Sequence, residues 1–224
     1  MEYKRITVVC GHYGSGKTNI ALNMAYDLKS GGNDVTIADL DIVNPYFRTK
    51  DSIDELNERG INLICSEYAG TNLDIPAMPD EMYAITDDLT RNYVLDIGGD
   101  DRGALALGRL APKIVSENNY SMIAVVNMYR PLTRDCASTV QVLREIEYAG
   151  GIGFTGIINN SNLGVDTAAG DVLNSVAYAY EISAAMNIPV IATAVDKRLK
   201  AELDGKINEL FYIELQNSLV NKEC

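Results

Sequence analysis

Gly11-His12-Tyr13-Gly14-Ser15-Gly16-Lys17-Thr18 follows the apolar run Ile6–Cys10 and precedes a segment with helical periodicity. It fits the pattern G-x-x-x-x-G-K-[ST], in which glycines let the backbone curl so that successive N–H groups point at an anion. The N-terminus of the following helix adds a partial positive charge. A phosphate-binding loop is therefore predicted, in which Lys17 contacts the phosphates and the Thr18 hydroxyl binds Mg²⁺.

Apolar runs and amphipathic stretches alternate along the rest of the chain. Further strands are predicted at 35–38, 61–65, 93–97, 122–126, 156–158 and 189–192, and helices at 17–29, 49–59, 80–90, 103–115, 132–149, 171–186 and 198–219. This alternation is typical of an α/β fold with a mostly parallel twisted sheet and helices on both faces. We expect a single domain, residues 1–224, with its polar residues gathered at the carboxyl ends of the strands.

The charge balance limits the classes of partner. The net charge is −12 over 224 residues, which disfavours nucleic acids and anionic membrane surfaces. The apolar side of the predicted helix 198–219 also carries acidic rather than basic neighbours, so it is expected to dock on the sheet and not on a membrane. With four scattered cysteines and no apolar N-terminal stretch, we expect a reduced, cytoplasmic protein.

Carboxylates follow two of the predicted strands. The apolar strand 93–97 carries Asp96 near its end, an arrangement typical of a Walker B acid that helps hold Mg²⁺ beside Thr18. Asp96-Ile97-Gly98-Gly99 resembles the D-x-x-G switch of P-loop ATPases and GTPases. That likeness makes Gly99 the candidate sensor of the γ-phosphate.

The loop at 11–18 and the later Asp39-Leu40-Asp41 together resemble the MinD/ParA group of deviant-Walker P-loop ATPases, in the CobQ/CobB/MinD/ParA nucleotide-binding family. The resemblance implies ATP and Mg²⁺ as cofactors, with Asp39 in the magnesium shell and Asp41 orienting the attacking water. It also implies a nucleotide-dependent homodimer. In the family a lysine early in the loop reaches across that dimer, and here His12 occupies its position, with Tyr13 where glycine is usual. His12 is either a functional replacement or a hydrogen-bonding loop residue.

The base of the nucleotide is assigned on the same resemblance, which implies that Asn159 reads it. Guanine-specific proteins use N-K-x-D, whereas residues 159–162 read Asn-Asn-Ser-Asn and lack both the lysine and the acid. Adenine is therefore favoured, with the segment 188–196 as the last strand and a loop beside the base. The alternative is a structural asparagine at the strand end.

Three functions are compatible with these residues. The first is an ATPase whose hydrolysis cycle switches the conformation of the chain and so acts on a protein client. The second is an ATP-dependent synthetase or small-molecule transferase, resembling dethiobiotin synthetase and the amidating cobyrinate enzymes, with Tyr46, Arg48 or Arg130 binding the acceptor. The third is a sensor that binds nucleotide without hydrolysing it.

Overall fold

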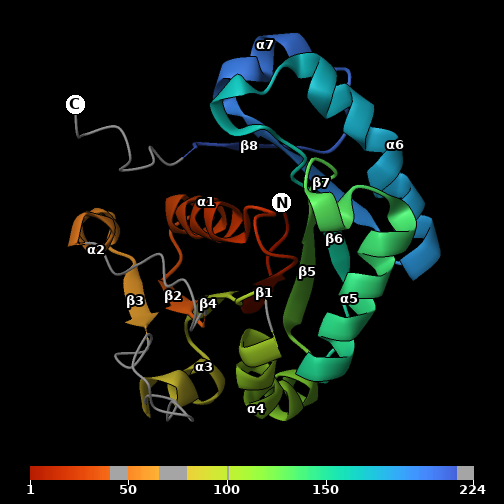
Figure 1. Cartoon of the computed structure of the whole chain (residues 1–224). Helices are drawn as coiled ribbons and strands as arrows, with labels where there is room; N and C mark the ends of the chain where they lie inside the picture. The colour runs from red at the N-terminus through yellow and green to blue at the C-terminus, as the bar shows by residue number, and fades with distance from the viewer. Residues whose placement is uncertain (41–49, 66–79, 100, 216–224) are drawn as a thin grey trace.

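The computed structural model describes residues 1–40, 50–65, 80–99 and 101–215 of the chain. Within them, eight strands form one continuous sheet in the order β3-β2-β4-β1-β5-β6-β7-β8, and every neighbouring pair is parallel (Figure 1). The strands are β1 (Ile6–Cys10), β2 (Val35–Asp39), β3 (Asn62–Cys65), β4 (Asn92–Asp96), β5 (Tyr120–Val126), β6 (Gly156–Asn159), β7 (Val190–Asp196) and β8 (Leu210–Ile213). The prediction of an α/β fold with a parallel sheet is confirmed.

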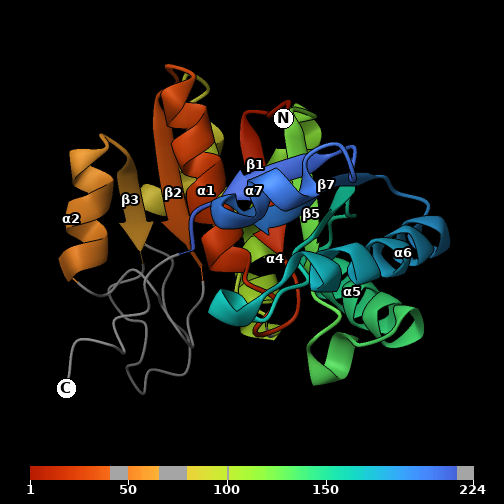
Figure 2. The same cartoon turned by 90° about the horizontal axis from the view of Figure 1, so that it is seen from above.

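Helices cover both faces of this sheet. They are α1 (Lys17–Ser30), α2 (Lys50–Glu58), α3 (Ala84–Asp87), α4 (Asp101–Glu117), α5 (Cys136–Gly150), α6 (Ala169–Met186) and α7 (Lys200–Leu203), with short 3-10 turns η2 (Asp80–Tyr83), η3 (Pro131–Thr133), η4 (Gly164–Asp166) and η5 (Lys197–Leu199). Figure 1 shows α1 and α2 on one face and α3, α4, α5 and α6 on the other. Seen from above in Figure 2, α2 and β3 lie at one end of the molecule and α5 and α6 at the other.

The two faces are filled by alternate residues of the same strands, because successive side chains of a strand point in opposite directions. In β1, Val9 packs in the cluster under α1, while Val8 packs in the cluster under α4 and α5. Val94 and Leu95 of β4 divide in the same way. The central strands are consequently apolar on both faces, as expected for a buried parallel sheet.

The register of the sheet brings its polar strand ends together. Asp39 at the end of β2 lies opposite Asp96 at the end of β4, and Asn159 at the end of β6 lies opposite Val126 of β5. Because all these strands are parallel, their carboxyl ends meet at one edge, next to the loop that follows β1. The expected convergence of polar residues at this edge is therefore observed.

The prediction of a closing helix at 198–219 is wrong for the part that the structure describes, which ends at residue 215. That part forms η5 and the four-residue α7, and then β8, which pairs in parallel with β7. α7 ends before Asp204, whose ψ of 129° is not helical, and Gly205 follows with a φ of 74°. Leu210, Phe211, Tyr212 and Ile213 then alternate between partly and fully buried, the period of a strand and not of a helix. The apolar residues read as one helical side therefore extend the sheet.

Within the described parts of the chain, no helix combines the length and the apolar character needed to cross a membrane.

Candidate functional site

The predicted phosphate-binding loop leads from the end of β1 into α1. Gly14 and Gly16 have φ values of 76° and 87°, in the left-handed region that favours glycine. A Cβ at Gly16 would also lie 2.3 Å from Asn160 Nδ2, so a larger residue would displace that amide. Since Gly16 is the N-cap residue of α1 and has no side chain to bond the first-turn N–H groups, those donors are available to an anion.

Lys17 and Thr18 begin α1, and they are the side chains that the sequence pattern assigns to phosphate and Mg²⁺. Lys17 is buried, and its Nζ donates a hydrogen bond to His12 O at 3.3 Å, so the ammonium folds back over the loop. Thr18 Oγ1 donates to Asp96 Oδ2 at 2.6 Å. The two predicted halves of the site, 78 residues apart along the chain, therefore meet in direct contact.

Two buried carboxylates end neighbouring strands at this edge. Asp39 is 3% exposed and Asp96 is 1% exposed, and the two lie in register. With the Thr18 hydroxyl they form an all-oxygen set of donors, the type that Mg²⁺ prefers. Among the described residues no three His, Cys, Asp or Glu side chains form a metal-binding group. Mg²⁺ usually takes one or two carboxylates and completes its shell with water and substrate phosphate.

Gly99 packs against the phosphate-binding loop. A Cβ on this residue would lie 2.7 Å from Tyr13 N, 3.0 Å from Gly11 O and 3.0 Å from Lys17 Nζ. The segment after β4 therefore lies against both the loop backbone and the loop lysine. This is where a sensor of the γ-phosphate would have to lie, and the sensor role itself stays a prediction.

Consecutive asparagines at the end of β6 have different surroundings. Asn159 is fully buried, and its Nδ2 donates to Ser175 Oγ of α6 at 2.8 Å, while its Oδ1 accepts from Ser161 N at 3.2 Å. Asn160 instead donates from Nδ2 to Ser15 O of the loop at 2.7 Å. The contacts of Asn159 match the alternative of a structural asparagine, and Asn160 is the residue that reaches the loop.

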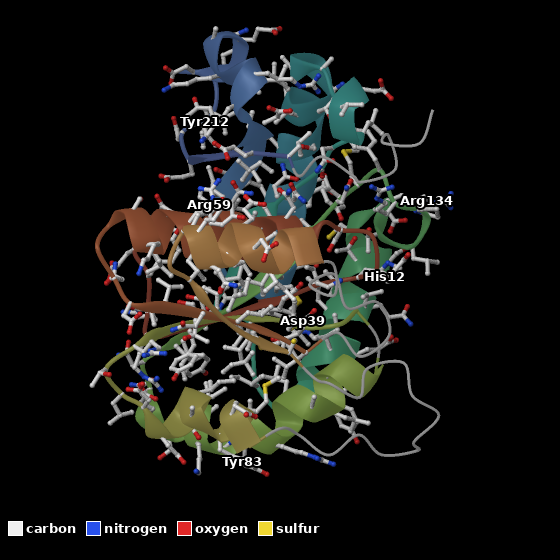
Figure 3. All side chains as sticks on the ribbon, turned by 90° about the vertical axis from the view of Figure 1, so that its left-hand side faces the viewer. His12, Asp39, Arg59, Tyr83, Arg134 and Tyr212 are labelled. Atoms are coloured by element: carbon white, nitrogen blue, oxygen red, sulfur yellow. The ribbon has the colours of Figure 1, made fainter. Side chains whose placement is uncertain are left out.

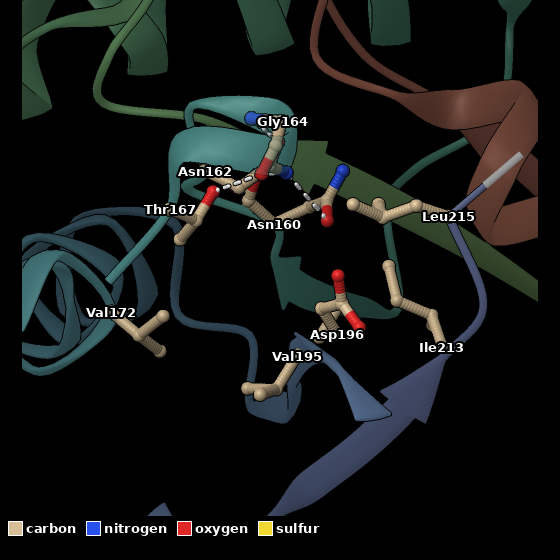
Figure 4. Close-up of a pocket in the computed structure, with 10 residues that line it drawn as sticks. Asn160, Asn162, Gly164, Thr167, Val172, Val195, Asp196, Ile213 and Leu215 are labelled. Atoms are coloured by element: carbon tan, nitrogen blue, oxygen red, sulfur yellow. Dashed lines mark hydrogen bonds between the residues drawn. The ribbon is translucent and has the colours of Figure 1, made fainter. Parts of the chain in front are cut away.

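A small hollow lies beyond the ends of β6, β7 and β8 (Figure 4). Its polar lining includes Asn160, Asn162 and Asp196, and its apolar lining includes Val172, Ala194, Val195, Ile213 and Leu215. Asn162 Nδ2 donates to Asn160 O at 2.8 Å and to its Oδ1 at 3.1 Å.

The rim of the hollow is held by Arg198. Its backbone N donates to Asp196 Oδ1 at 3.0 Å, and its Nε lies 2.9 Å from Asp196 Oδ2. Its Nη2 donates to Gly164 O at 3.3 Å and to Thr167 O at 3.1 Å. The loops after β6 and β7 are thereby fastened to each other. The sequence predicted the segment 188–196 beside the base, and did not predict that Asn160, Asn162 and Leu215 line the same hollow as its last residues.

The residues between Gly11 and Gly14 face outward. His12 is partly exposed, and its Nδ1 lies 2.9 Å from Tyr13 O, while the Tyr13 side chain is 65% exposed. Figure 3 shows His12 and Asp39 toward the same end of the sheet. His12 therefore has the contacts of a hydrogen-bonding loop residue, and its part in a dimer stays a prediction.

Ser15, in the same loop, is buried, and within the described residues its Oγ has no hydrogen-bond partner.

Arg130, in the loop after β5, reaches back to the phosphate-binding loop. Its Nε donates to Gly14 O at 2.8 Å. The loop that carries it is held by buried hydrogen bonds: Thr133 Oγ1 donates to Asn127 O at 2.8 Å, and Tyr178 Oη donates to Thr133 O at 2.7 Å. Arg130 is thus presented from a fixed support, and it brings a second cation to the glycine-rich loop besides Lys17.

The remaining sequence predictions fall on residues that the structure does not describe. Asp41, the predicted water-orienting residue, lies outside the described residues, and so do Tyr46 and Arg48.

Comparisons with known proteins agree with this arrangement. The family model for the CobQ/CobB/MinD/ParA nucleotide binding domain matches residues 6–216. Among curated proteins, no match is found.

Solved structures with a similar fold include three FtsY proteins, of which the first is a signal recognition particle receptor. FtsY from Elizabethkingia anophelis, in complex with GDP, has 15% identity and a TM-score of 0.50, with 87% of this chain and 58% of that chain covered. FtsY from Mycoplasma mycoides has 17% identity and a TM-score of 0.53, with 86% of this chain and 61% of that chain covered. Chloroplast FtsY from Physcomitrella patens has 18% identity and a TM-score of 0.57, with 88% of this chain and 60% of that chain covered. The chain thus spans less than two thirds of these FtsY chains, and at such identities the likeness concerns the fold alone.

Proposed function

This chain belongs to the CobQ/CobB/MinD/ParA nucleotide-binding family, and on that premise we propose that it is an ATPase that works with Mg²⁺ as a switch on a protein client. The observation that carries the proposal is the contact of Thr18 Oγ1 with Asp96 Oδ2 at 2.6 Å, beneath a glycine-rich loop against which Gly99 packs. This contact brings together the loop proposed to bind phosphate, the Thr18 and Asp96 side chains proposed to bind Mg²⁺ and the proposed sensor Gly99, all at the carboxyl ends of the strands.

The residues of the loop would bind the triphosphate. The backbone N–H groups of residues 11–18 and the Lys17 ammonium, which has three donors and uses one on His12 O, would contact the phosphates. Thr18, Asp96 and Asp39 would hold Mg²⁺, which on binding would neutralise phosphate charge. Asp41, in line with the family resemblance, would orient the attacking water.

Gly99 would convert the presence of the γ-phosphate into a change of shape. Its N–H is the proposed donor to that phosphate, and the segment it belongs to leads directly into α4. When the γ-phosphate leaves after hydrolysis, this bond is lost and the start of α4 is free to move. The proposed client would respond to that movement.

Adenine is the proposed base, and the hollow beside Asn160 is its proposed pocket. Asn160 links this hollow to the loop through Ser15 O, so a nucleotide whose phosphates lie in the loop would place its base there. The amides of Asn160 and Asn162 offer donors and acceptors, and adenine presents both on its edge.

The client, or a second copy of the chain, is proposed to bind at the outer rim of the loop. Tyr13 is 65% exposed and Leu132 is 61% exposed there, and the Arg130–Gly14 bond ties their two loops together. Exposed aromatic and aliphatic residues beside a ligand site are typical of interaction surfaces. We also propose a reduced, cytoplasmic location, in line with the four single, scattered cysteines of the sequence.

Calorimetry and a phosphate-release assay test the proposal. Wild type, Lys17→Ala and Lys29→Ala are compared for binding of ATP and GTP with Mg²⁺; Lys29 lies in the last turn of the same helix and is the matched control. We expect Lys17→Ala to weaken ATP binding about a hundredfold and Lys29→Ala to leave it unchanged.

Four results would contradict the proposal or parts of it. If the wild type binds no nucleotide, the whole proposal is refuted. Tighter binding of GTP than ATP overturns the adenine assignment. Phosphate release that requires an added small carboxylate or amine favours the synthetase, and tight binding without release favours the sensor.

A further inference from the structure

The segment that follows β8 is fastened to α1 only two turns after the start of the helix. Asn23 of α1 is buried; its Oδ1 accepts from Glu214 N at 2.8 Å, and its Nδ2 donates to Glu214 O at 3.0 Å. Asn19 Nδ2 donates to the same carbonyl at 3.2 Å. A single amide side chain therefore pairs with both backbone groups of a residue 191 positions away, as a neighbouring strand would.

The side chain of Glu214 adds bonds on its outer side. Its Oε1 lies 2.5 Å from Lys197 Nζ, and its Oε2 lies 4.0 Å from Arg59 Nη2. The hydrogen bond and charge of Lys197 lower the pKa of this carboxyl. All three side chains are about half exposed, and exposed ion pairs of this kind contribute little to stability. The buried pairing with Asn23 is consequently the main fastening of this segment.

This fastening fixes one wall of the hollow described above. Leu215, the residue directly after Glu214, lines the hollow together with Ile213, which precedes it by two positions as expected for an extended chain. The amides of Asn160 and Asn162 form part of the lining that they share, as Figure 4 shows. An apolar wall and polar groups around a small hollow suit a flat heteroaromatic ring with polar edges.

We propose that Leu215 is the apolar wall on which the base of the bound nucleotide packs, and that Asn23 is a positioning residue that holds this wall in place. The inference rests on the proposed nucleotide-binding function. It assigns the recognition of the base partly to Leu215, at the end of the described residues. The position of this residue is fixed by the bonds of Asn23, in α1, to Glu214. The helix that begins at the phosphate loop thus positions both ends of the nucleotide.

The test compares a ligand that has the base with one that lacks it. ATP and inorganic tripolyphosphate, each with Mg²⁺, are measured by competition against a fluorescent ATP analogue. The variants are Leu215→Ala, which removes the wall and its packing on the cluster under α1, and Asn23→Leu, which removes both bonds to Glu214 and those to Asn19. Asn33→Ala is the control, because its amide bonds Leu28 O at 2.9 Å at the other end of α1. Leu215→Ala decides the matter if Asn23→Leu does not fold.

We expect both variants to bind ATP about tenfold more weakly and tripolyphosphate within about twofold of wild type. The control should match wild type for both ligands. Unchanged ATP binding in Leu215→Ala overturns the inference, and so does an equal loss for ATP and tripolyphosphate, since a purely structural role would affect the phosphate loop as well. If wild type binds ATP no better than tripolyphosphate, the base has no pocket and the inference fails while phosphate binding stands. If wild type binds neither, the proposed function fails first.

Discussion

Gly99→Ala adds one methyl group at the point where the segment after β4 packs on the phosphate-binding loop. The new Cβ would lie 2.7 Å from Tyr13 N, 3.0 Å from Gly11 O and 3.0 Å from Lys17 Nζ. Two of these atoms are backbone and cannot move without the loop, and the third belongs to the lysine proposed to bind phosphate. Substitution here therefore acts on the loop by steric overlap.

The size of the effect follows from these contacts. Overpacking of a close-packed site costs about 1–3 kcal/mol, which at roughly 2–4 °C per kcal/mol lowers the melting temperature by about 4–8 °C for a 2 kcal/mol cost. If Lys17 Nζ is displaced, one charged hydrogen bond to phosphate worth about 1.5–3 kcal/mol is lost, so ATP binds about tenfold to a hundredfold more weakly.

Differential scanning calorimetry and isothermal titration calorimetry measure both effects, with Gly170→Ala as the matched control. Gly170 lies in the first turn of α6, is exposed, and has open space where its Cβ would be. The control should bind ATP normally and gain up to about 1 kcal/mol from helix propensity. Normal ATP affinity together with an unchanged melting temperature in Gly99→Ala would refute this account of the site.

Three further substitutions test other contacts of the site. Thr18→Val keeps the shape of the side chain but removes the hydroxyl that bonds the β4 carboxylate, so ATP affinity should lose most of its dependence on Mg²⁺, as a magnesium titration of the affinity will show. Arg130→Ala frees the Gly14 carbonyl and removes a cation, so ATP should bind about threefold to tenfold more weakly. The control Arg134→Ala should have no effect, because the Arg134 side chain lies 3.9 Å from the neighbouring Asp135. Equal ATP affinities of the two variants would contradict the role of the Arg130–Gly14 bond. Tyr178→Phe removes a hydrogen bond that supports the loop carrying Arg130. Burial raises the pKa of Tyr178 to about 12, so above pH 10 the folded state keeps a proton that the unfolded state loses. The stability that is present below pH 10 is therefore lost as the pH rises from 10 to 12. Urea unfolding should show that wild type loses about 0.8 kcal/mol more than Tyr178→Phe between pH 8 and pH 10.5, and parallel losses would contradict the assignment.

Local patterns in the sequence were sufficient for the loop and for most of the elements. The glycine positions, the lysine and the threonine of residues 11–18 are spaced by the requirements of a turn around phosphate, and those requirements are met within eight residues. The strands through 196 follow from apolar runs bounded by turns. Asp96 could be predicted from such a run, and Gly99 from its distance to Asp96. These predictions need only backbone geometry over a few residues.

The rest depended on contacts between distant segments. Asn159 and Asn160 are adjacent in sequence, but consecutive residues at a strand end point to opposite faces, so the register of β6 decided that Asn160 and not Asn159 meets the loop. The last segment had apolar residues that suited a helix, and pairing with β7 made it a strand. The bonds of Arg130 to Gly14 and of Asn23 to Glu214 span 116 and 191 positions. No local periodicity encodes such pairs, because only the closed sheet brings their partners within hydrogen-bond distance.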